Sequence, residues 1–183
     1  LTSQYDSKIS NWFSKSLTSK KNLPKNRYDL KYGENPNQSA YYLSKTKNNF
    51  IKKTKITDQK LSYNNLLDID SAINLINEFK EPTCIIIKHN NPCGAATADN
   101  INIAYKKALG SDPKSAFGGI VILNRNVNNV LSKKINEKFF EIVIAKSFNK
   151  NALVNLRNKK RLILISLNKY NLKQNKEMRS VLD

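Results

Sequence analysis

The stretch that most constrains the fold is an apolar run at residues 83–87 with the polar segment that follows it. Residues 83–96 read T-C-I-I-I-K-H-N-N-P-C-G-A-A. Five β-forming residues without polar alternation are typical of a strand buried on both faces of a sheet. The Asn, Pro and Gly residues that follow predict a turn, and Ala95 and Ala96 then lead towards a helical segment. We therefore expect a central strand, a turn and a helix, in this order.

Lys88 and His89 stand at the carboxyl end of this predicted strand, and His89 is the only histidine in the chain. Ligands of open α/β sheets bind at the carboxyl ends of strands, because loops converge there over a crevice. A loop-capping lysine and a hydrogen-bonded histidine would explain the pair equally well. The local pattern therefore leaves a functional and a structural interpretation open.

The surrounding sequence alternates between helical and extended patterns. Helices are expected at residues 68–79, 100–109, 129–139 and 149–156. Apolar strands are expected at residues 119–123, 141–145 and 162–167. Strict alternation of this kind predicts a largely parallel sheet that is covered by helices.

Loops and short elements fill the remaining regions. Residues 30–38, L-K-Y-G-E-N-P-N-Q, combine Gly with an Asn-Pro turn and predict a loop of fixed shape. Residues 39–43 and 50–57 are expected to form a hairpin with its turn at residues 46–49. Residues 110–119 contain three glycines, whose backbone can approach a ligand closely and cradle an anion.

The net charge of +18 at first suggests a nucleic-acid partner. The basic residues are spread along a chain rich in Lys, Asn and Ile, however, and a compositional bias explains them better than a specific basic surface. The two cysteines form no C-x-x-C pair, and neither a signal peptide nor an apolar run long enough to span a membrane is present in these residues. We therefore expect a protein of the reduced cytoplasm, without specific nucleic-acid binding.

Four motifs within residues 31–120 resemble one known family. They read K-Y-G-E-N-P-N-Q, L-S-Y-N-N-L-L-D-I-D-S-A, K-H-N-N-P-C-G-A-A and S-D-P-K-S-A-F-G-G-I, in this order. This is the family of bifunctional purine-biosynthesis proteins that join AICAR transformylase to IMP cyclohydrolase. The resemblance implies a three-layer α/β/α unit of the cytidine-deaminase-like kind, with a mostly parallel mixed sheet. Residues 1–26 would be a helical linker after a cyclohydrolase domain, and residues 27–183 an incomplete first half of the transformylase region.

The resemblance also implies a reaction and a set of site residues. The family transfers the formyl group of the co-substrate 10-formyltetrahydrofolate to the 5-amino group of AICAR, with no metal, in a homodimer whose active sites are shared. His89 would act as the base, because an imidazole of near-neutral pKa suits removal of a proton during attack by a weak amine. Lys88 would stabilise the developing oxyanion. The residues that would contact the nucleotide are Lys31, Tyr32, Asn65, Gly118 and Glu141.

Three positions depart from the usual pattern of the family. Lys31 replaces an Arg and so keeps the charge but loses the two-pronged geometry that suits phosphate. Asn37 replaces a His, and Lys146 replaces a Pro. These departures put the strength of phosphate binding and any role of that histidine in question.

Two other functions remain as alternatives. A zinc-dependent nucleoside deaminase would share the implied fold, but its His-x-Glu and Pro-Cys-x-x-Cys signature is incomplete here. His89 is followed by Asn90, and Cys93 by Gly94, Ala95 and Ala96, so the segment offers fewer than the three ligands a catalytic zinc needs. A basic nucleic-acid-binding module would use stacking aromatics, but no recognised motif of such modules accompanies the tyrosines.

Overall fold

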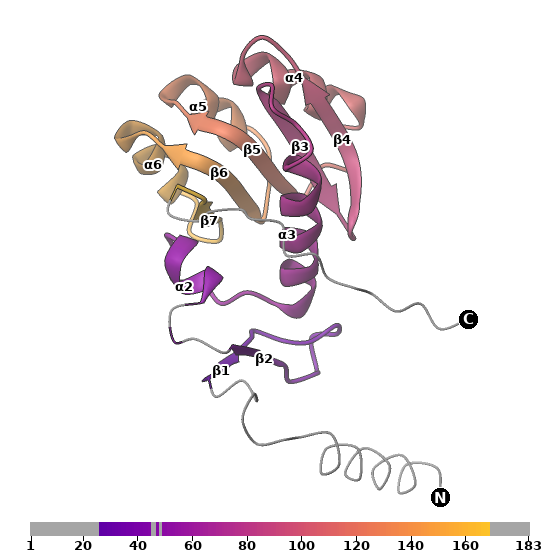
Figure 1. Ribbon diagram of the computed structural model, residues 1–183, viewed down its shortest axis with the longest axis vertical. Coiled ribbons are helices and arrows are strands. Elements are labelled where there is room, and N and C mark those ends of the chain that lie inside the picture. Colours follow the sequence, from indigo (N-terminus) through magenta and orange to yellow (C-terminus); the bar gives the residue numbers. More distant parts are fainter. Residues whose placement is uncertain (1–25, 45–46, 48, 169–183) are drawn as a thin grey trace, which may run out of the picture.

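The structure is a computed structural model that describes residues 26–44, 47 and 49–168 (Figure 1). The linker helix is expected within residues 1–26, of which residues 1–25 lie outside the described residues. In chain order the elements are β1 (Asn26–Asp29), β2 (Tyr41–Ser44), α2 (Phe50–Thr54), α3 (Tyr63–Ile76), β3 (Thr83–Lys88), β4 (Asn91–Thr97), α4 (Ile101–Ser111), β5 (Ile120–Val127), α5 (Asn129–Asn136), β6 (Ile142–Phe148), α6 (Lys150–Arg157) and β7 (Ile163–Ser166).

The main sheet has five strands in the order β4-β3-β5-β6-β7. The pairs β5/β6 and β6/β7 are parallel, whereas β3 runs antiparallel to both of its neighbours, β4 and β5. The expectation of a largely parallel sheet is therefore wrong for β3 and β4, and the sheet is mixed. The reason is local, because a turn of two residues joins β3 to β4 and forces the two strands to be antiparallel.

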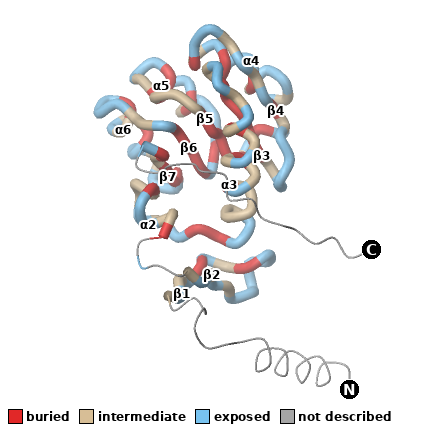
Figure 2. Tube along the Cα trace, viewed as in Figure 1, coloured by how far each residue is buried: buried red, intermediate tan, exposed pale blue. Residues whose placement is uncertain are grey.

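Helices cover both faces of this sheet and make a three-layer α/β/α arrangement. Helices α4, α5 and α6 lie on one face and α3 lies on the other, as Figure 1 shows. Because helices cover both faces, the residues of β3 alternate between two hydrophobic cores. Cys84 and Ile86 belong to the core under α4 to α6, whereas Ile85 and Ile87 belong to the core under α3. Residues 83–87 are all buried, and Figure 2 shows buried segments along the central strands β3, β5 and β6. The predicted burial on both faces is confirmed.

The predicted hairpin of residues 39–57 is wrong in its second strand. Residues Phe50–Thr54 form helix α2. Its N-cap is Asn49, whose side chain accepts a hydrogen bond from the backbone of Lys52 at 3.0 Å. Strand β2 instead pairs with β1, which precedes it in the chain. Phe50 and Ile51 of α2 pack against the same core as α3. An Asn before an apolar residue is an N-cap signal, and this cap decides for a helix.

The segment after the central strand also differs from expectation. Residues Asn91–Thr97 form strand β4 and do not lead into a helix; α4 begins only after Asn100, whose side chain caps it. Gly94 of β4 lies so close to α4 that a Cβ atom there would be 2.1 Å from the carbonyl oxygen of Ala108. This glycine therefore allows β4 and α4 to pack backbone to backbone.

Candidate active site at one edge of the sheet

The turn between β3 and β4 consists of His89 and Asn90, since Lys88 pairs directly with Asn91 across the hairpin. Both turn residues have positive φ angles, 50° and 63°. Hairpin turns of two residues favour this backbone because it matches the twist of the strands. A left-handed conformation costs a non-glycine residue roughly 1–2 kcal/mol, although His and Asn adopt it more often than most residues. His89 is exposed at the tip of this hairpin.

Side chains of α3, together with Asn91 of β4, hold the turn. The Oδ1 atom of Asp68 accepts a hydrogen bond from the backbone N–H of Asn90 at 2.7 Å. The hydroxyl of Ser71 donates to Oδ1 of Asn90 at 3.4 Å, and Nδ2 of Asn91 donates to the carbonyl oxygen of His89 at 2.9 Å. A hydrogen bond to a charged group contributes about 1.5–3 kcal/mol, which offsets the strain of at least one turn residue.

Lys88, at the end of β3, reaches the loop that leads into β5. Its Nζ atom donates to the carbonyl oxygen of Phe117 at 2.7 Å. The next residue, Gly118, has φ +74° and donates its N–H to the carbonyl oxygen of Phe139 at 2.8 Å. Positive φ explains the need for glycine at this position. This loop therefore holds the ammonium of Lys88 next to Gly118, so two of the predicted site residues lie close together.

The start of the same loop is shaped by Asp112. The backbone N–H of Ser115 donates to Oδ1 of Asp112 at 3.0 Å. Hydrogen bonds from the side chain and backbone of Ser115 hold the pKa of the Asp112 carboxyl below its usual range. The loop therefore has internal structure of its own before it reaches Lys88.

Glu141 lies immediately before β6, and its side chain meets α3. The Nδ2 atom of Asn65 donates to Oε2 of Glu141 at 3.0 Å. The other end of the Asn65 amide belongs to the N-terminal cap of the helix: its Oδ1 accepts from the backbone of Ser62 at 3.0 Å, while the Ser62 hydroxyl accepts from the backbone of Asn65 at 3.1 Å. This reciprocal capping box fixes the amide of Asn65 and, through it, the carboxylate of Glu141.

The loop that contains Lys31 and Tyr32 is tied to the same end of α3. Lys31 donates its backbone N–H to Leu61 at 2.8 Å, and Tyr32 accepts from the backbone of Tyr63 at 3.0 Å. The Lys31 ammonium lies 5.2 Å from the centre of the Tyr32 ring, a cation–π distance. Gly33 donates its N–H to the Gln38 carbonyl at 2.8 Å, which confirms that this loop holds a defined shape.

The structure brings the seven predicted site residues to one edge of the sheet through the direction of β3. Because β3 is antiparallel to β5 and β5 is parallel to β6, the carboxyl end of β3 lies beside the amino ends of β5 and β6. Lys88 and His89 follow β3, whereas Gly118 and Glu141 precede the other two strands. The amino-terminal half of α3 and the loop attached to it complete this group with Asn65, Lys31 and Tyr32.

Sequence reasoning missed the residues that support these side chains, chiefly Asp68. Asp68 and Asp70 both belong to the L-L-D-I-D-S-A motif, and helical spacing alone does not say which of them faces the turn. Asp68 bonds the turn, whereas Asp70 is exposed and accepts from Asn74 at 3.2 Å. Lys146, one of the three residues that differ from the usual family pattern, is exposed and lies towards the carboxyl end of β6.

The candidate site is partly exposed. Lys31, His89 and Glu141 are exposed, as is Phe117, with 62% of its surface accessible. Among the residues that the structure describes, no three His, Cys, Asp or Glu side chains gather where they could hold a metal ion. Within the same residues, no helix is both long and apolar enough to cross a membrane.

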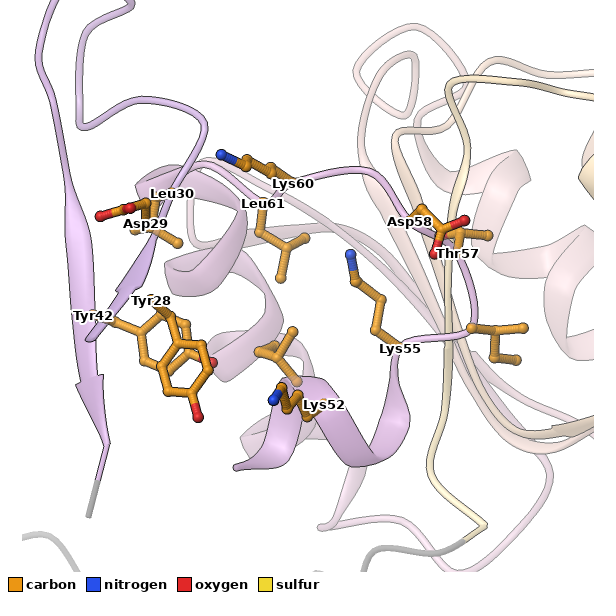
Figure 3. A pocket seen from close by; sticks show the side chains of 12 residues that line it. Tyr28, Asp29, Leu30, Tyr42, Lys52, Lys55, Thr57, Asp58, Lys60 and Leu61 are labelled. Atoms are coloured by element: carbon orange, nitrogen blue, oxygen red, sulfur yellow. The ribbon is translucent and has the colours of Figure 1, made fainter. Parts of the chain in front are cut away.

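A separate cavity of about 330 Å³ lies between the β1–β2 hairpin and α2 (Figure 3). The rings of Tyr28 and Tyr42 stack on its hairpin side with centroids 4.9 Å apart, and Lys52 and Lys55 line it from α2 and the residue that follows. Its lining includes none of the seven predicted site residues. The carboxyl end of β3 and this cavity are therefore distinct features of the surface.

Comparisons with known proteins agree with the motifs. The model of the AICARFT/IMPCHase bienzyme family matches residues 1–183. Bifunctional purine biosynthesis protein PurH from Caldicellulosiruptor saccharolyticus is 46% identical over 178 residues, which cover 91% of this chain and 34% of that protein. PurH from Clostridium botulinum is 42% identical over 174 residues, covering 90% and 34%.

PurH from Halalkalibacterium halodurans is 44% identical over 144 residues, which cover 77% of this chain and 28% of that protein. The chain thus spans about a third of the length of the curated relatives it matches. Since the family model covers the whole chain and the identities exceed 40%, the chain belongs to the AICARFT/IMPCHase bienzyme family of purine biosynthesis.

Proposed function

We propose that the chain forms part of an AICAR transformylase site, which passes the formyl group of 10-formyltetrahydrofolate to the 5-amino group of AICAR. One observation carries the proposal: Lys88 and His89 share a sheet edge with Gly118, Glu141 and the end of α3. A base, a cation and polar anchors for a nucleotide are the groups that this reaction needs. The names of the relatives, which are purine-biosynthesis proteins, support the same conclusion.

His89 is the proposed base. The aryl amine of AICAR is a weak nucleophile, because its lone pair is delocalised, so a proton must leave the nitrogen as the bond to the formyl carbon forms. The imidazole takes that proton. The tetrahedral intermediate then breaks the bond between its carbon and N10 of the folate, N10 receives a proton, and FAICAR and tetrahydrofolate leave.

Lys88 is the proposed electrostatic partner. Its ammonium is held at 2.7 Å by the carbonyl oxygen of Phe117, one residue before Gly118. A cation fixed in this way requires little reorganisation when negative charge develops on the formyl oxygen. Lys31, Tyr32, Asn65, Gly118 and Glu141 are proposed to hold the nucleotide, with Lys31 nearest its phosphate.

The exposed residues of the site suggest that other parts of the protein complete it. Catalysis needs two substrates held in near-attack geometry with water excluded, and the exposed side chains of Lys31, His89 and Glu141 need further groups around them for this. We therefore propose that residues 27–183 are the first half of a transformylase region and that residues 1–26 link it to a cyclohydrolase domain. The remaining contacts would come from the second half and from the partner in a homodimer. A cytoplasmic location suits the two free cysteines, Cys84 and Cys93.

The test is formyl transfer by the full-length protein and three variants. His89→Ala should lower turnover at least a hundredfold, as loss of a general base does, while AICAR binding changes less than about tenfold. Lys88→Ala should lower turnover as well, whereas Lys133→Ala, at an exposed position of α5, should change nothing. Turnover within about tenfold of the unmodified enzyme in His89→Ala would overturn the assignment of the base.

A further inference from the structure

The hairpin tip that carries His89 has a backbone conformation that non-glycine residues seldom adopt. His89 and Asn90 both adopt positive φ, at 50° and 63°, although neither is glycine. Such residues persist only where the surrounding structure holds them in place. The strand register fixes the base of the turn, because Lys88 pairs with Asn91, but it leaves the tip itself exposed. Within the hairpin, the side chain of Asn91 donates to the carbonyl oxygen of His89, and further support for Asn90 comes from α3.

We infer that Asp68 is the residue that positions His89, and this role rests on the function proposed above. Its carboxylate accepts the backbone N–H of Asn90 at 2.7 Å, and one turn later on the same helix Ser71 bonds the side chain of Asn90 at 3.4 Å. Both contacts hold the second residue of the turn. The direction of the His89 side chain depends on the backbone angles that these contacts maintain.

Helix α3 provides a rigid base for this support. Ile69, Ala72 and Ile76 are buried against β3 and β5 and anchor the helix to the sheet. Asp68 precedes the first of these anchors directly. A base must lie within hydrogen-bonding reach of the proton that it removes, so a tip that moves relative to α3 would cost turnover more than binding.

Substitutions can separate the effect of the Asp68–Asn90 hydrogen bond from an effect on the overall stability of the protein. An asparagine at position 68 keeps an oxygen acceptor in the same place, whereas an alanine removes it. Asp70 is the matched control, because it lies on the same helix, is exposed and accepts a hydrogen bond from Asn74 at 3.2 Å. The comparison of Asp68→Ala, Asp68→Asn and Asp70→Ala therefore isolates one hydrogen bond.

The first measurement is amide hydrogen exchange of the peptide containing Asn90 in the full-length protein. Asp68→Ala should raise the exchange rate of that amide at least tenfold, because its acceptor is lost. Asp68→Asn and Asp70→Ala should leave the rate close to that of the unmodified protein. Unchanged protection in Asp68→Ala would overturn the inference, and this readout does not depend on which reaction the enzyme performs.

The second measurement is the division of the kinetic effect between kcat and KM. Asp68→Ala should lower kcat about tenfold or more with the KM for AICAR within about threefold, and Asp68→Asn should recover most of kcat. Equal loss of thermal stability and activity in Asp68→Ala and Asp70→Ala would reduce Asp68 to a structural residue and overturn the inference. If His89→Ala retains full activity, the proposed function fails, and hydrogen exchange still decides whether Asp68 holds the turn.

Discussion

The Nδ2 atom of Asn65 donates a hydrogen bond of 3.0 Å to Oε2 of Glu141, which is 76 positions away in the chain. The same amide caps α3 through its oxygen, so one side chain fixes both the start of a helix and a carboxylate before β6. A contact with the nucleotide is predicted for Asn65 from the sequence, and its hydrogen bonds in the structure indicate that it positions Glu141. The two roles predict different effects for different substitutions.

Asn65→Asp should keep the helix cap and remove the hydrogen bond to Glu141. An aspartate keeps the oxygen that accepts from Ser62 and suits a helix N-terminus, so the free energy of unfolding should change by less than about 0.5 kcal/mol. It places a second carboxylate against Glu141, however, and the KM for AICAR should rise about tenfold. Kinetics and urea unfolding of the full-length protein measure both effects. Asn151→Asp, the same substitution at an exposed position in the first turn of α6, is the control; an equal rise of KM there would contradict the prediction.

Lys31→Ala should raise the KM for AICAR more than it lowers kcat. A phosphate contact stabilises the bound ground state and the transition state alike, so its loss appears in KM. Lys31→Arg should lower KM, because a guanidinium binds phosphate with two parallel hydrogen bonds. Steady-state kinetics with AICAR as the varied substrate decides the matter. A fall in kcat at constant KM would show that Lys31 takes part in the chemistry.

Gly118→Ala and Gly110→Ala should change stability in opposite directions. Gly118 has φ +74°, which costs an alanine roughly 1–2 kcal/mol. Gly110 lies within α4, and a Cβ atom there would meet nothing within 4 Å. Alanine at position 110 should therefore stabilise the protein by about 0.4–1 kcal/mol. Urea unfolding of both variants tests the pair, and destabilisation by Gly110→Ala would contradict this account of the helix.

Tyr42 should make stability fall between pH 10 and pH 12. Burial, and to a lesser extent the nearby Tyr28, raise the pKa of Tyr42 from 10.0 to about 12. Between these values the unfolded chain releases the phenolic proton and the folded protein keeps it, so this contribution is complete below pH 10 and is lost by about pH 12. Tyr42→Phe should flatten this part of the curve of unfolding free energy against pH.

The matched control for this titration is Tyr41→Phe, since Tyr41 precedes Tyr42 in β2 and is 51% exposed. Other groups that titrate at high pH remain in both variants, so the difference between the two curves isolates Tyr42. The same slope in the unmodified protein and in Tyr42→Phe would show that Tyr42 is not the group concerned.

Parts of the fold follow from local sequence patterns. The run at residues 83–87 predicts burial on both faces, and the structure confirms it, because Ile86 and Ile87 enter two different cores. The helices near α4, α5 and α6 follow from apolar spacing to within a few residues. Helix α2 was mistaken for a strand, since its five residues are too few to show a period and only the cap at Asn49 distinguishes them.

By itself the sequence determined that residues 83–87 are buried on both faces of a sheet and which motifs connect the chain to its family. Only the tertiary structure decided that Lys88 and His89 lie at the same end of the sheet as Gly118 and Glu141. Hydrophobic periodicity carries no information on the direction of a strand, so a parallel β3 would have left the Lys-His pair at the opposite edge of the sheet. The turn at His89 and Asn90, held by Asp68, reverses the chain, and the antiparallel pairing of β3 with β5 then places the four residues together.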